Sequence, residues 1–215
     1  MARATQTPLW SVRHLVEKAG FFPVAAQLQR RVPPYTPVGY HTNVKKIVYL
    51  SLGSNLGNRQ ANLRAAIGRL MELGEVLQVS SLYQTEPVEV TDQPWFLNCA
   101  VAMKTELVPH ELLAGILSIE AAMGRERTRS KGPRLIDIDI LLLGAATIKT
   151  PRLTVPHPAM AERRFVLEPL AEIAPQLRHP RLKKTVRELL RALPRGGPKA
   201  KRVRRELMGG GEAPA

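Results

Sequence analysis

Two aspartates, separated by a single residue, lie within the otherwise apolar run Leu135–Leu143. Side chains along a β-strand alternate between its two faces, so Asp137 and Asp139 are predicted to project to the same side. Carboxylates placed so close repel each other and lose hydration, and a bound cation relieves both costs. Mg²⁺ prefers hard oxygen ligands and often combines one or two carboxylates with phosphate oxygens. The spacing therefore predicts a magnesium site. The alternative is that both carboxylates pair with arginines in a purely structural role.

The residues just before that run form a basic loop. Its five cations are Arg125, Arg127, Arg129, Lys131 and Arg134. A guanidinium group matches phosphate oxygens through two parallel hydrogen bonds. A charged run alone usually indicates a solvated loop, but cations next to two carboxylates supply what a polyphosphate with its metal ions requires. We therefore interpret the loop and the aspartate pair as parts of one polyphosphate site.

A histidine stands between two prolines in the stretch 152–158. Because Pro156 and Pro158 restrict the backbone around it, the imidazole of His157 is held in a fixed place and can donate a hydrogen bond to a phosphate. The alternative is a structural histidine. The chain has neither a Walker A lysine motif nor a Gly-x-Gly-x-x-Gly run, so an ordinary P-loop or Rossmann nucleotide site is not supported.

The elements that must position these residues follow from periodicity and turn residues. Strands are predicted over residues 47–52, 76–83, 96–105 and 135–143, and helices over 58–73 and 109–124. The order is β-α-β-β-α-β, which predicts a ferredoxin-like α+β sandwich. A C-terminal extension follows, with a helix near residues 159–173. On the last strand, the face opposite the aspartates is expected to carry Ile136, Ile138, Ile140 and Leu142.

Charge is uneven along the 215 residues, whose net charge is +14. Residues 44–176 hold fifteen Lys or Arg and fourteen Asp or Glu, whereas residues 177–215 hold twelve and three. The domain that carries the motifs is assigned to residues 44–195. Residues 1–43 form an N-terminal extension of unknown role. Residues 196–215, rich in Gly, Pro, Lys and Arg, are predicted to be a disordered basic tail that binds polyanions weakly.

Other functional classes fit less well. RNA-recognition domains share this order of elements, but they carry an aromatic-rich strand motif that is absent here, and two strand carboxylates would repel phosphate without a metal. The sequence contains no run of about 18 apolar residues that could span a membrane. A single cysteine, Cys99, excludes a disulfide framework within the chain. A monomeric cytoplasmic protein is expected.

Six stretches carry a family resemblance over the region from Val44 to about Pro180. They are residues 52–57 (LGSNLG), 80–87 (SSLYQTEP), 93–98 (QPWFLN), 124–125 (GR), 132–139 (GPRLIDID) and 152–158 (RLTVPHP). In this order and near this spacing, they resemble the 6-hydroxymethyl-7,8-dihydropterin pyrophosphokinase family of folate biosynthesis. The resemblance implies transfer of pyrophosphate from Mg-ATP to 6-hydroxymethyl-7,8-dihydropterin, with AMP as the second product.

The resemblance also implies roles for individual residues. Asp137 and Asp139 would hold two Mg²⁺ ions around ATP, with Arg125, Arg134 and His157 completing the catalytic set. The pterin would lie between two aromatic rings and meet the Asn98 amide at its edge; its expected contacts are Thr85, Pro87, Val88, Phe96, Asn98 and Phe165. The expected contacts of ATP are Arg125, Arg127, Lys131, Arg134, Ile140, Arg152, Thr154, His157 and Arg163.

The chain departs from the family pattern at two loops. The 125–134 loop is one residue shorter than in many relatives, and Lys131 stands where a tryptophan usually precedes Gly132. Glu89 stands where relatives often have glycine. Both changes concern loops expected to border the substrates.

Overall fold

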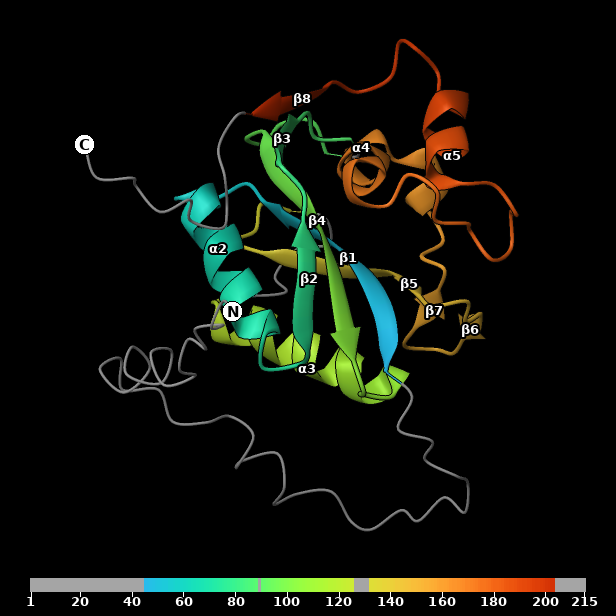
Figure 1. Cartoon of the computed structure of the whole chain (residues 1–215). Coiled ribbons are helices and arrows are strands. Elements are labelled where there is room, and N and C mark those ends of the chain that lie inside the picture. The colour runs from blue at the N-terminus through green and yellow to red at the C-terminus, as the bar shows by residue number, and fades with distance from the viewer. Residues whose placement is uncertain (1–44, 89, 126–131, 204–215) are drawn as a thin grey trace, which may run out of the picture. The chain divides into compact units, whose positions relative to one another are not determined.

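A mixed sheet-and-helix architecture is seen in the computed structural model, which describes residues 45–88, 90–125 and 132–203, all within the compact unit Asn43–Ala215. A six-stranded antiparallel sheet has the order β5-β1-β4-β3-β8, and β2 also pairs with β4 (Figure 1). Its strands are β1 (Lys46–Ser54), β2 (Glu75–Val79), β3 (Leu82–Thr85), β4 (Phe96–Thr105), β5 (Asp137–Leu143) and β8 (Ala200–Val203). A small second sheet pairs β6 (Ile148–Lys149) with β7 (Thr154–Val155).

Helices cover both faces of the main sheet. α2 (Arg59–Leu70) and α3 (Pro109–Ala122) pack on one face, where they share an apolar core with β1, β4 and β5. A 3-10 turn, η3 (Met160–Glu162), leads into α4 (Arg164–Ile173), which forms a second core with α5 (Val186–Ala192) on the other face. The predicted ferredoxin-like α+β sandwich is confirmed, and the C-terminal extension supplies its third layer. No helix of the described part of the chain is long and apolar enough to cross a membrane.

The helix ends follow local chemistry. The Asn58 side chain caps α2 by accepting a hydrogen bond from the backbone N–H of Ala61 at 3.1 Å. Gly124, which follows α3, has φ of +83°, a conformation that glycine adopts without steric cost. Both signals are local, so both helices begin and end close to the positions predicted from the sequence.

The strand predicted over residues 76–83 is interrupted and forms two strands, β2 and β3. The backbone N–H of Ser80 donates to the carbonyl of Ala100, but the N–H of Ala100 donates to the Ser80 hydroxyl at 2.9 Å. A side chain thus replaces a backbone acceptor in the ladder, and regular pairing stops there. This break turns β3 toward the edge of the sheet, where it meets β8.

The predicted faces of β5 hold only for its first half. Leu50 of β1 pairs with Ile140 and Tyr49 pairs with Leu142, so the register shifts by one residue at Leu141. Such a bulge turns the following side chain to the opposite face. Ile140 therefore packs in the core under α2 and α3, whereas Leu141 and Leu142 both pack in the core under α4 and α5. Placing Leu142 with Ile140 was wrong for this reason.

The tail predicted to be disordered from Gly196 contains an ordered strand. β8 pairs antiparallel with β3 from Leu82↔Val203 to Thr85↔Ala200, so residues up to Val203 belong to the main domain. The sequence prediction was wrong here because composition does not reveal a vacant sheet edge that can pair with the chain. Residues 204–215, also placed in that tail, lie outside the described residues.

Two glycines offer a matched test of this packing. A Cβ at Gly74 would lie 2.3 Å from the backbone carbonyl oxygen of Lys104, whereas a Cβ at Gly68 in α2 would meet nothing within 4 Å. We expect Gly74→Ala to lower the free energy of unfolding by about 1–3 kcal/mol, because β2 must move away from β4. Gly68→Ala should raise it by roughly 0.5–1 kcal/mol through helix propensity. Urea unfolding of both variants measures the difference, and equal effects would contradict the close approach at Gly74.

Candidate active site

A cleft of about 540 Å³ opens on the face of the sheet that α4 covers in part. Its floor is made by neighbouring residues of three strands. Asp139 pairs with Ser51 in the ladder and Asp137 pairs with Gly53, which in turn faces Asn98 on β4. Asp137 and Asp139 both line the cleft, so the predicted shared face is confirmed. The cleft forms where polar side chains replace the apolar ones that hold α4 and α5.

Gly53 lets the floor close around the amide of Asn98. A Cβ at this position would lie 2.5 Å from Asn98 Oδ1, which is closer than any real contact. Asn98 Nδ2 donates to Thr85 Oγ1 at 2.6 Å, and both residues are buried. The amide is therefore fixed, and its oxygen faces a backbone with no side chain in the way. Such an amide can read the donor and acceptor pattern of a flat heterocycle.

Two aromatic rings line the same part of the cleft, and each is associated with an arginine. The Arg134 guanidinium carbon lies 5.3 Å from the Phe96 ring centre, and that of Arg163 lies 5.6 Å from the Phe165 ring centre. These are cation–π distances. Pro87 and Val88 complete this wall. A partly apolar wall thus borders a group of cations within one cleft.

A chain of charged groups joins α3, the basic loop and β5. Arg125 pairs with Asp137 at 2.6 Å, Arg134 pairs with Asp137 at 2.7 Å, and Arg125 also binds the carboxylate of Glu120. Glu120 in α3 is only 3% exposed and also accepts from the backbone N–H of Ile138 at 2.8 Å. Burial raises the pKa of the Glu120 carboxyl, although these two donors act in the opposite direction. The arginine-pairing alternative thus describes Asp137 in this structure.

Asn55 connects the basic loop to the loop before β4. Its side chain accepts from the backbone N–H of Arg134 at 2.7 Å and donates to Gln93 Oε1 at 3.0 Å and to the carbonyl of Pro94 at 3.3 Å. Asn55 is 2% exposed, so these bonds form away from water. One buried amide therefore joins Arg134 to residues 93–94 beside the cleft.

Asp139 and His157 share a less hydrated part of the cleft. Burial raises the pKa of Asp139, and the negative charge of Asp137 raises it further, against the attraction of His157 and Arg163. Burial lowers the pKa of His157, although Asp139 opposes this shift. The Nδ1 atom of His157 accepts from the backbone N–H of Ala159 at 3.3 Å, which leaves Nε2 as the donor of the neutral ring.

These features fit a divalent cation that arrives with a polyphosphate. Asp139 carries the electrostatic cost of a neighbouring carboxylate, which a cation would remove. Mg²⁺ typically takes one or two carboxylates and completes its shell with phosphate oxygens and water. Among the described residues, no group of three or more His, Cys, Asp or Glu side chains is placed to hold a metal. Asp137 and Asp139 are the residues that would hold the ion.

The structure brings most of the predicted site residues into this one cleft. They are Thr85, Pro87, Val88, Phe96, Asn98, Arg125, Arg134, Asp137, Asp139, His157, Arg163 and Phe165. Three others are not in its lining. Ile140 follows Asp139 and so packs in the core on the opposite face, Arg152 is exposed elsewhere, and Thr154 lies in β7. Arg127 and Lys131 fall outside the described residues.

Sequence reasoning missed several residues of the site. Ser51 and Gln93 line the cleft, and Glu120 holds Arg125 from behind it. The sequence signal for Glu120 was weak, because a single glutamate in a helix is usually exposed to solvent. Its burial shows its role, and burial depends on β5 lying against α3.

Comparison with known proteins gives consistent relatives. A family model described as 7,8-dihydro-6-hydroxymethylpterin-pyrophosphokinase (HPPK) matches residues 49–175. The 2-amino-4-hydroxy-6-hydroxymethyldihydropteridine pyrophosphokinase of Methylorubrum extorquens is 53% identical over 131 residues, which cover 60% of this chain and 83% of the relative. The enzyme of the same name from Bacillus subtilis is 48% identical over 136 residues, covering 62% of this chain and 81% of the relative.

Solved structures agree on the fold. A crystal structure of wild-type Plasmodium falciparum HPPK-DHPS with pterin and p-hydroxybenzoate superposes with a TM-score of 0.57 at 21% sequence identity. The match covers 69% of this chain and 43% of that chain. At this identity the superposition shows a shared fold.

Removal of Glu120 tests the charged chain. We expect Glu120→Ala to lower the free energy of unfolding by about 3 kcal/mol, because Arg125 and the buried N–H of Ile138 lose their acceptor. Glu120→Gln keeps one acceptor and should cost less. As a matched control, Glu106 pairs with Lys45 at 3.4 Å on the surface, and Glu106→Ala should change stability by less than about 1 kcal/mol. Chemical unfolding of the three variants decides, and equal losses at positions 120 and 106 would contradict the buried role.

Proposed function

Because the chain belongs to the 7,8-dihydro-6-hydroxymethylpterin-pyrophosphokinase family, we propose that it transfers a pyrophosphoryl group from Mg-ATP to 6-hydroxymethyl-7,8-dihydropterin in folate biosynthesis. The products are the pterin diphosphate and AMP. One observation supports this function above the others: two aromatic rings with a fixed amide and a cluster of cations and carboxylates share a single cleft. The catalytic unit extends from residue 44 to Val203, since β8 completes the sheet.

The two halves of the cleft correspond to the two substrates. The pterin ring lies by Phe96 and Phe165, and its polar edge meets the Asn98 amide that Thr85 holds in place. The triphosphate lies by the guanidinium groups of Arg125, Arg134 and Arg163 and by His157. Aromatic side chains offer apolar faces to a flat ring, and arginine forks match phosphate oxygens.

The reaction is a displacement at phosphorus. The hydroxymethyl oxygen of the pterin forms a bond to the β-phosphorus of ATP, the bond from that phosphorus to the oxygen of the α-phosphate breaks, and AMP leaves with the electron pair. The hydroxyl proton is released. The protein contributes by positioning the two substrates and by placing cations around the transferred group.

The two carboxylates of β5 have a role in binding metal in this scheme. Asp137 and Asp139 would hold Mg²⁺, for which we propose two ions. When bound, the metal neutralises phosphate charge and orients the phosphate chain. In the present structure Asp137 is paired with Arg125 and Arg134. These arginines exchange the carboxylate for phosphate oxygens when ATP binds, so neither the cations nor the carboxylate is left without a partner in either state.

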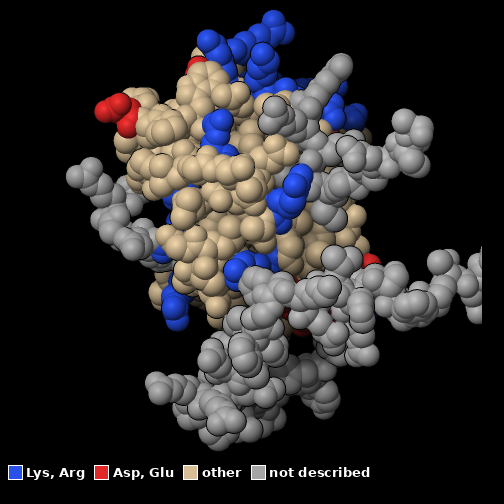
Figure 2. Space-filling view, turned by 90° about the vertical axis from the view of Figure 1, so that its left-hand side faces the viewer, with Lys and Arg blue, Asp and Glu red and all other residues tan. Residues whose placement is uncertain are grey.

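We also propose that the enzyme is a monomer in the cytoplasm and that its C-terminal tail binds polyanions weakly. The face shown in Figure 2 carries many more Lys and Arg than Asp and Glu side chains, and they are densest at its upper edge. Two cations of the C-terminal segment already have partners, since Lys199 pairs with Glu86 and Arg202 pairs with Glu172. Any polyanion therefore meets fewer free charges than the composition suggests.

Product analysis tests the function directly. The purified full chain, given Mg-ATP, should form AMP only when 6-hydroxymethyl-7,8-dihydropterin is added, with pterin diphosphate formed in equal amount. Chromatography with mass detection measures both products. Formation of ADP in place of AMP, or AMP formation that does not depend on the pterin, would remove the proposed reaction.

Replacing either aspartate by asparagine should reduce turnover, but the two substitutions should shift the unfolding temperature in opposite directions. Burial and Asp137 raise the pKa of Asp139 and so disfavour its charged form in the folded state. Asp139→Asn should therefore unfold at a higher temperature than the parent in EDTA, with an advantage that grows as pH rises through the folded pKa of Asp139 and disappears in acid. Asp137→Asn should unfold at a lower temperature, because Arg125 and Arg134 lose a charged partner.

Both substitutions should reduce turnover by at least ~10²-fold, or about 2.7 kcal/mol, in saturating Mg-ATP. Thermal unfolding and AMP formation are measured on the same preparations. Two folded variants with the parent's rate would exclude the metal-binding role. An Asp139→Asn variant that is less stable than the parent would favour the structural arginine-pairing alternative.

A further inference from the structure

The C-terminal strand β8 lies against the part of the sheet that forms the pterin side of the cleft. Its partner β3 has only four residues, and the last of them is Thr85, which fixes the Asn98 amide. Without β8, β3 would be a short edge strand paired on one side. A strand this short is held by few ladder bonds, so the position of Thr85 depends on both of its neighbours.

Beyond Thr85, the segment leading into β8 also holds the loop that borders the cleft. The backbone N–H of Glu86 donates to the carbonyl of Lys199 at 3.2 Å, and the N–H of Lys199 donates to Glu86 Oε2 at 3.1 Å. The next residues, Pro87 and Val88, line the cleft. The path of this loop is thus tied at its first residue to a strand that lies more than a hundred positions later in the chain.

A second, smaller cavity of about 180 Å³ lies between the C-terminal segment and the cleft wall. Residues 193–199 contribute to one side of it, and Glu86, Val88 and Phe165 contribute to the other. Phe165 borders both cavities, so the C-terminal segment lies across this second cavity from one of the two aromatic rings.

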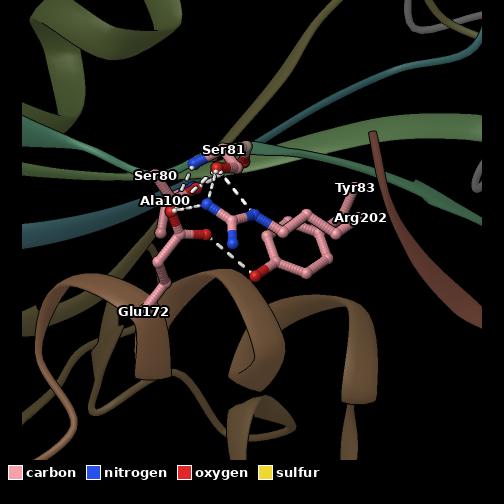
Figure 3. Close-up of polar contacts among 6 residues, drawn as sticks. All are labelled: Ser80, Ser81, Tyr83, Ala100, Glu172 and Arg202. Carbon is pink, nitrogen blue, oxygen red and sulfur yellow. Dashed lines mark hydrogen bonds and ion pairs between the residues drawn. The ribbon is translucent and has the colours of Figure 1, made fainter. Parts of the chain in front are cut away.

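A polar network joins β8 to α4 and to the start of β3 (Figure 3). Arg202 donates to Ser81 Oγ through Nε at 2.9 Å and through a terminal nitrogen at 2.7 Å, and the same terminal nitrogen lies 3.2 Å from Glu172 Oε1. Glu172 also accepts from the Ser81 hydroxyl and from the Tyr83 hydroxyl, each at 2.8 Å. One carboxylate therefore joins α4 to the start of β3 and to β8.

The charge state of the network favours its persistence. Burial opposes the charge of Glu172, but the hydrogen bonds from Ser81 and Tyr83 outweigh it, and the pKa of Glu172 lies below its ordinary value. Glu172 thus stays ionised at neutral pH and keeps attracting Arg202. Burial and the carboxylate together raise the pKa of Tyr83, which stays a donor.

The network connects the two elements that carry the pterin wall. α4 carries Phe165 in its first turn and Glu172 seven residues later. At 1.5 Å per residue, the two positions are about 10 Å apart along the helix axis. β3 carries Ser81 just before its start and Thr85 at its end. The elements are fastened at Glu172 and Ser81, and they present Phe165 and Thr85 to the cleft at the other end.

We propose that β8 acts as a clasp that positions the pterin side of the cleft, with Arg202 as a positioning residue that sets pterin affinity by fixing β3 against α4. Arg202 does not line the cleft, so it acts only through Ser81, Glu172 and the ladder to β3. The proposal deepens the proposed function and rests on the assignment of this side of the cleft to the pterin.

The test compares two cations of the same strand in the full chain. Arg202→Ala removes the clasp, and Arg202→Lys restores one charge without the fork. Lys201→Ala is the matched control, because Lys201 pairs with Gln84 in the same ladder but its side chain makes no hydrogen bond or ion pair with a described residue. For each variant, kcat and the KM values of pterin and ATP are measured from AMP formation, next to thermal unfolding.

We expect Arg202→Ala to raise the pterin KM about three- to tenfold, the effect of losing one charged hydrogen-bonded contact transmitted in part to the pocket. The ATP KM should stay within about twofold, Arg202→Lys should fall between parent and Ala, and Lys201→Ala should match the parent. A folded Arg202→Ala variant with unchanged pterin KM would overturn the proposal. Equal increases in both KM values would also overturn it, because they would show an effect on the whole cleft and not on its pterin side.

A second measurement is independent of catalysis. Hydrogen exchange of the amides from Leu82 to Glu86 should become faster in Arg202→Ala and stay unchanged in Lys201→Ala, because the clasp holds this segment whether or not substrate is present. Unchanged exchange in both variants would overturn the clasp. Faster exchange in a protein that forms no pterin-dependent AMP would retain the clasp and remove the proposed function, so the two failures are distinguishable.

Discussion

Two carboxylates two residues apart on one face of β5 impose the main electrostatic constraint of this structure. Asp137 is balanced by Arg125 and Arg134, while Asp139 is partly buried and has a raised pKa. Burying such a pair is unfavourable unless cations compensate it. Glu120 adds a further negative charge and at the same time holds Arg125 beside Asp137, and the proposed metal ions would supply the remaining positive charge. The cost is localised at the place where the proposed magnesium ions would compensate the two carboxylates.

The layers of the fold decide where this place can be. α2 and α3 cover one face of the sheet completely enough to bury the apolar side chains of β1, β4 and β5. On the other face, α4 and α5 pack over Tyr49, Ala100 and Leu142, and the polar ends of the same strands remain open. The bulge at Leu141 makes this division possible, because it turns two successive leucines toward α4 and α5 beyond the two aspartates.

The walls of the cleft have a different origin from its floor. The floor is a property of three long central strands, whose ladders fix Gly53, Asn98 and Asp137 relative to one another. The wall to which we assign the pterin consists of the end of a four-residue strand, a loop and the first turn of α4, which are held by fewer ladder hydrogen bonds than the floor. Buried amides and carboxylates such as Asn55 and Glu172 compensate by joining segments that are distant in the chain. Hydrogen-bonded polar groups of this kind specify geometry at a modest cost in stability.

Local patterns in the sequence determined the elements and the chemistry of the floor. Alternation along a strand placed Asp137 and Asp139 on one face, and Asn58 and Gly124 marked helix ends, because these effects act between residues that are close in the chain. The order of motifs also sufficed to indicate the pyrophosphokinase family. Of the site residues that the family resemblance implied, twelve line the cleft, from Thr85 to Phe165.

Only the tertiary structure decided the remaining features, because each depends on a partner far away in the sequence. Ser80 ends a strand because its hydroxyl meets Ala100, and Glu120 is buried because β5 lies against α3. Ile140 faces the core because the register of β5 against β1 places it there. β8 is a strand because β3 offers a vacant edge, a partner more than a hundred residues earlier that composition and periodicity cannot reveal.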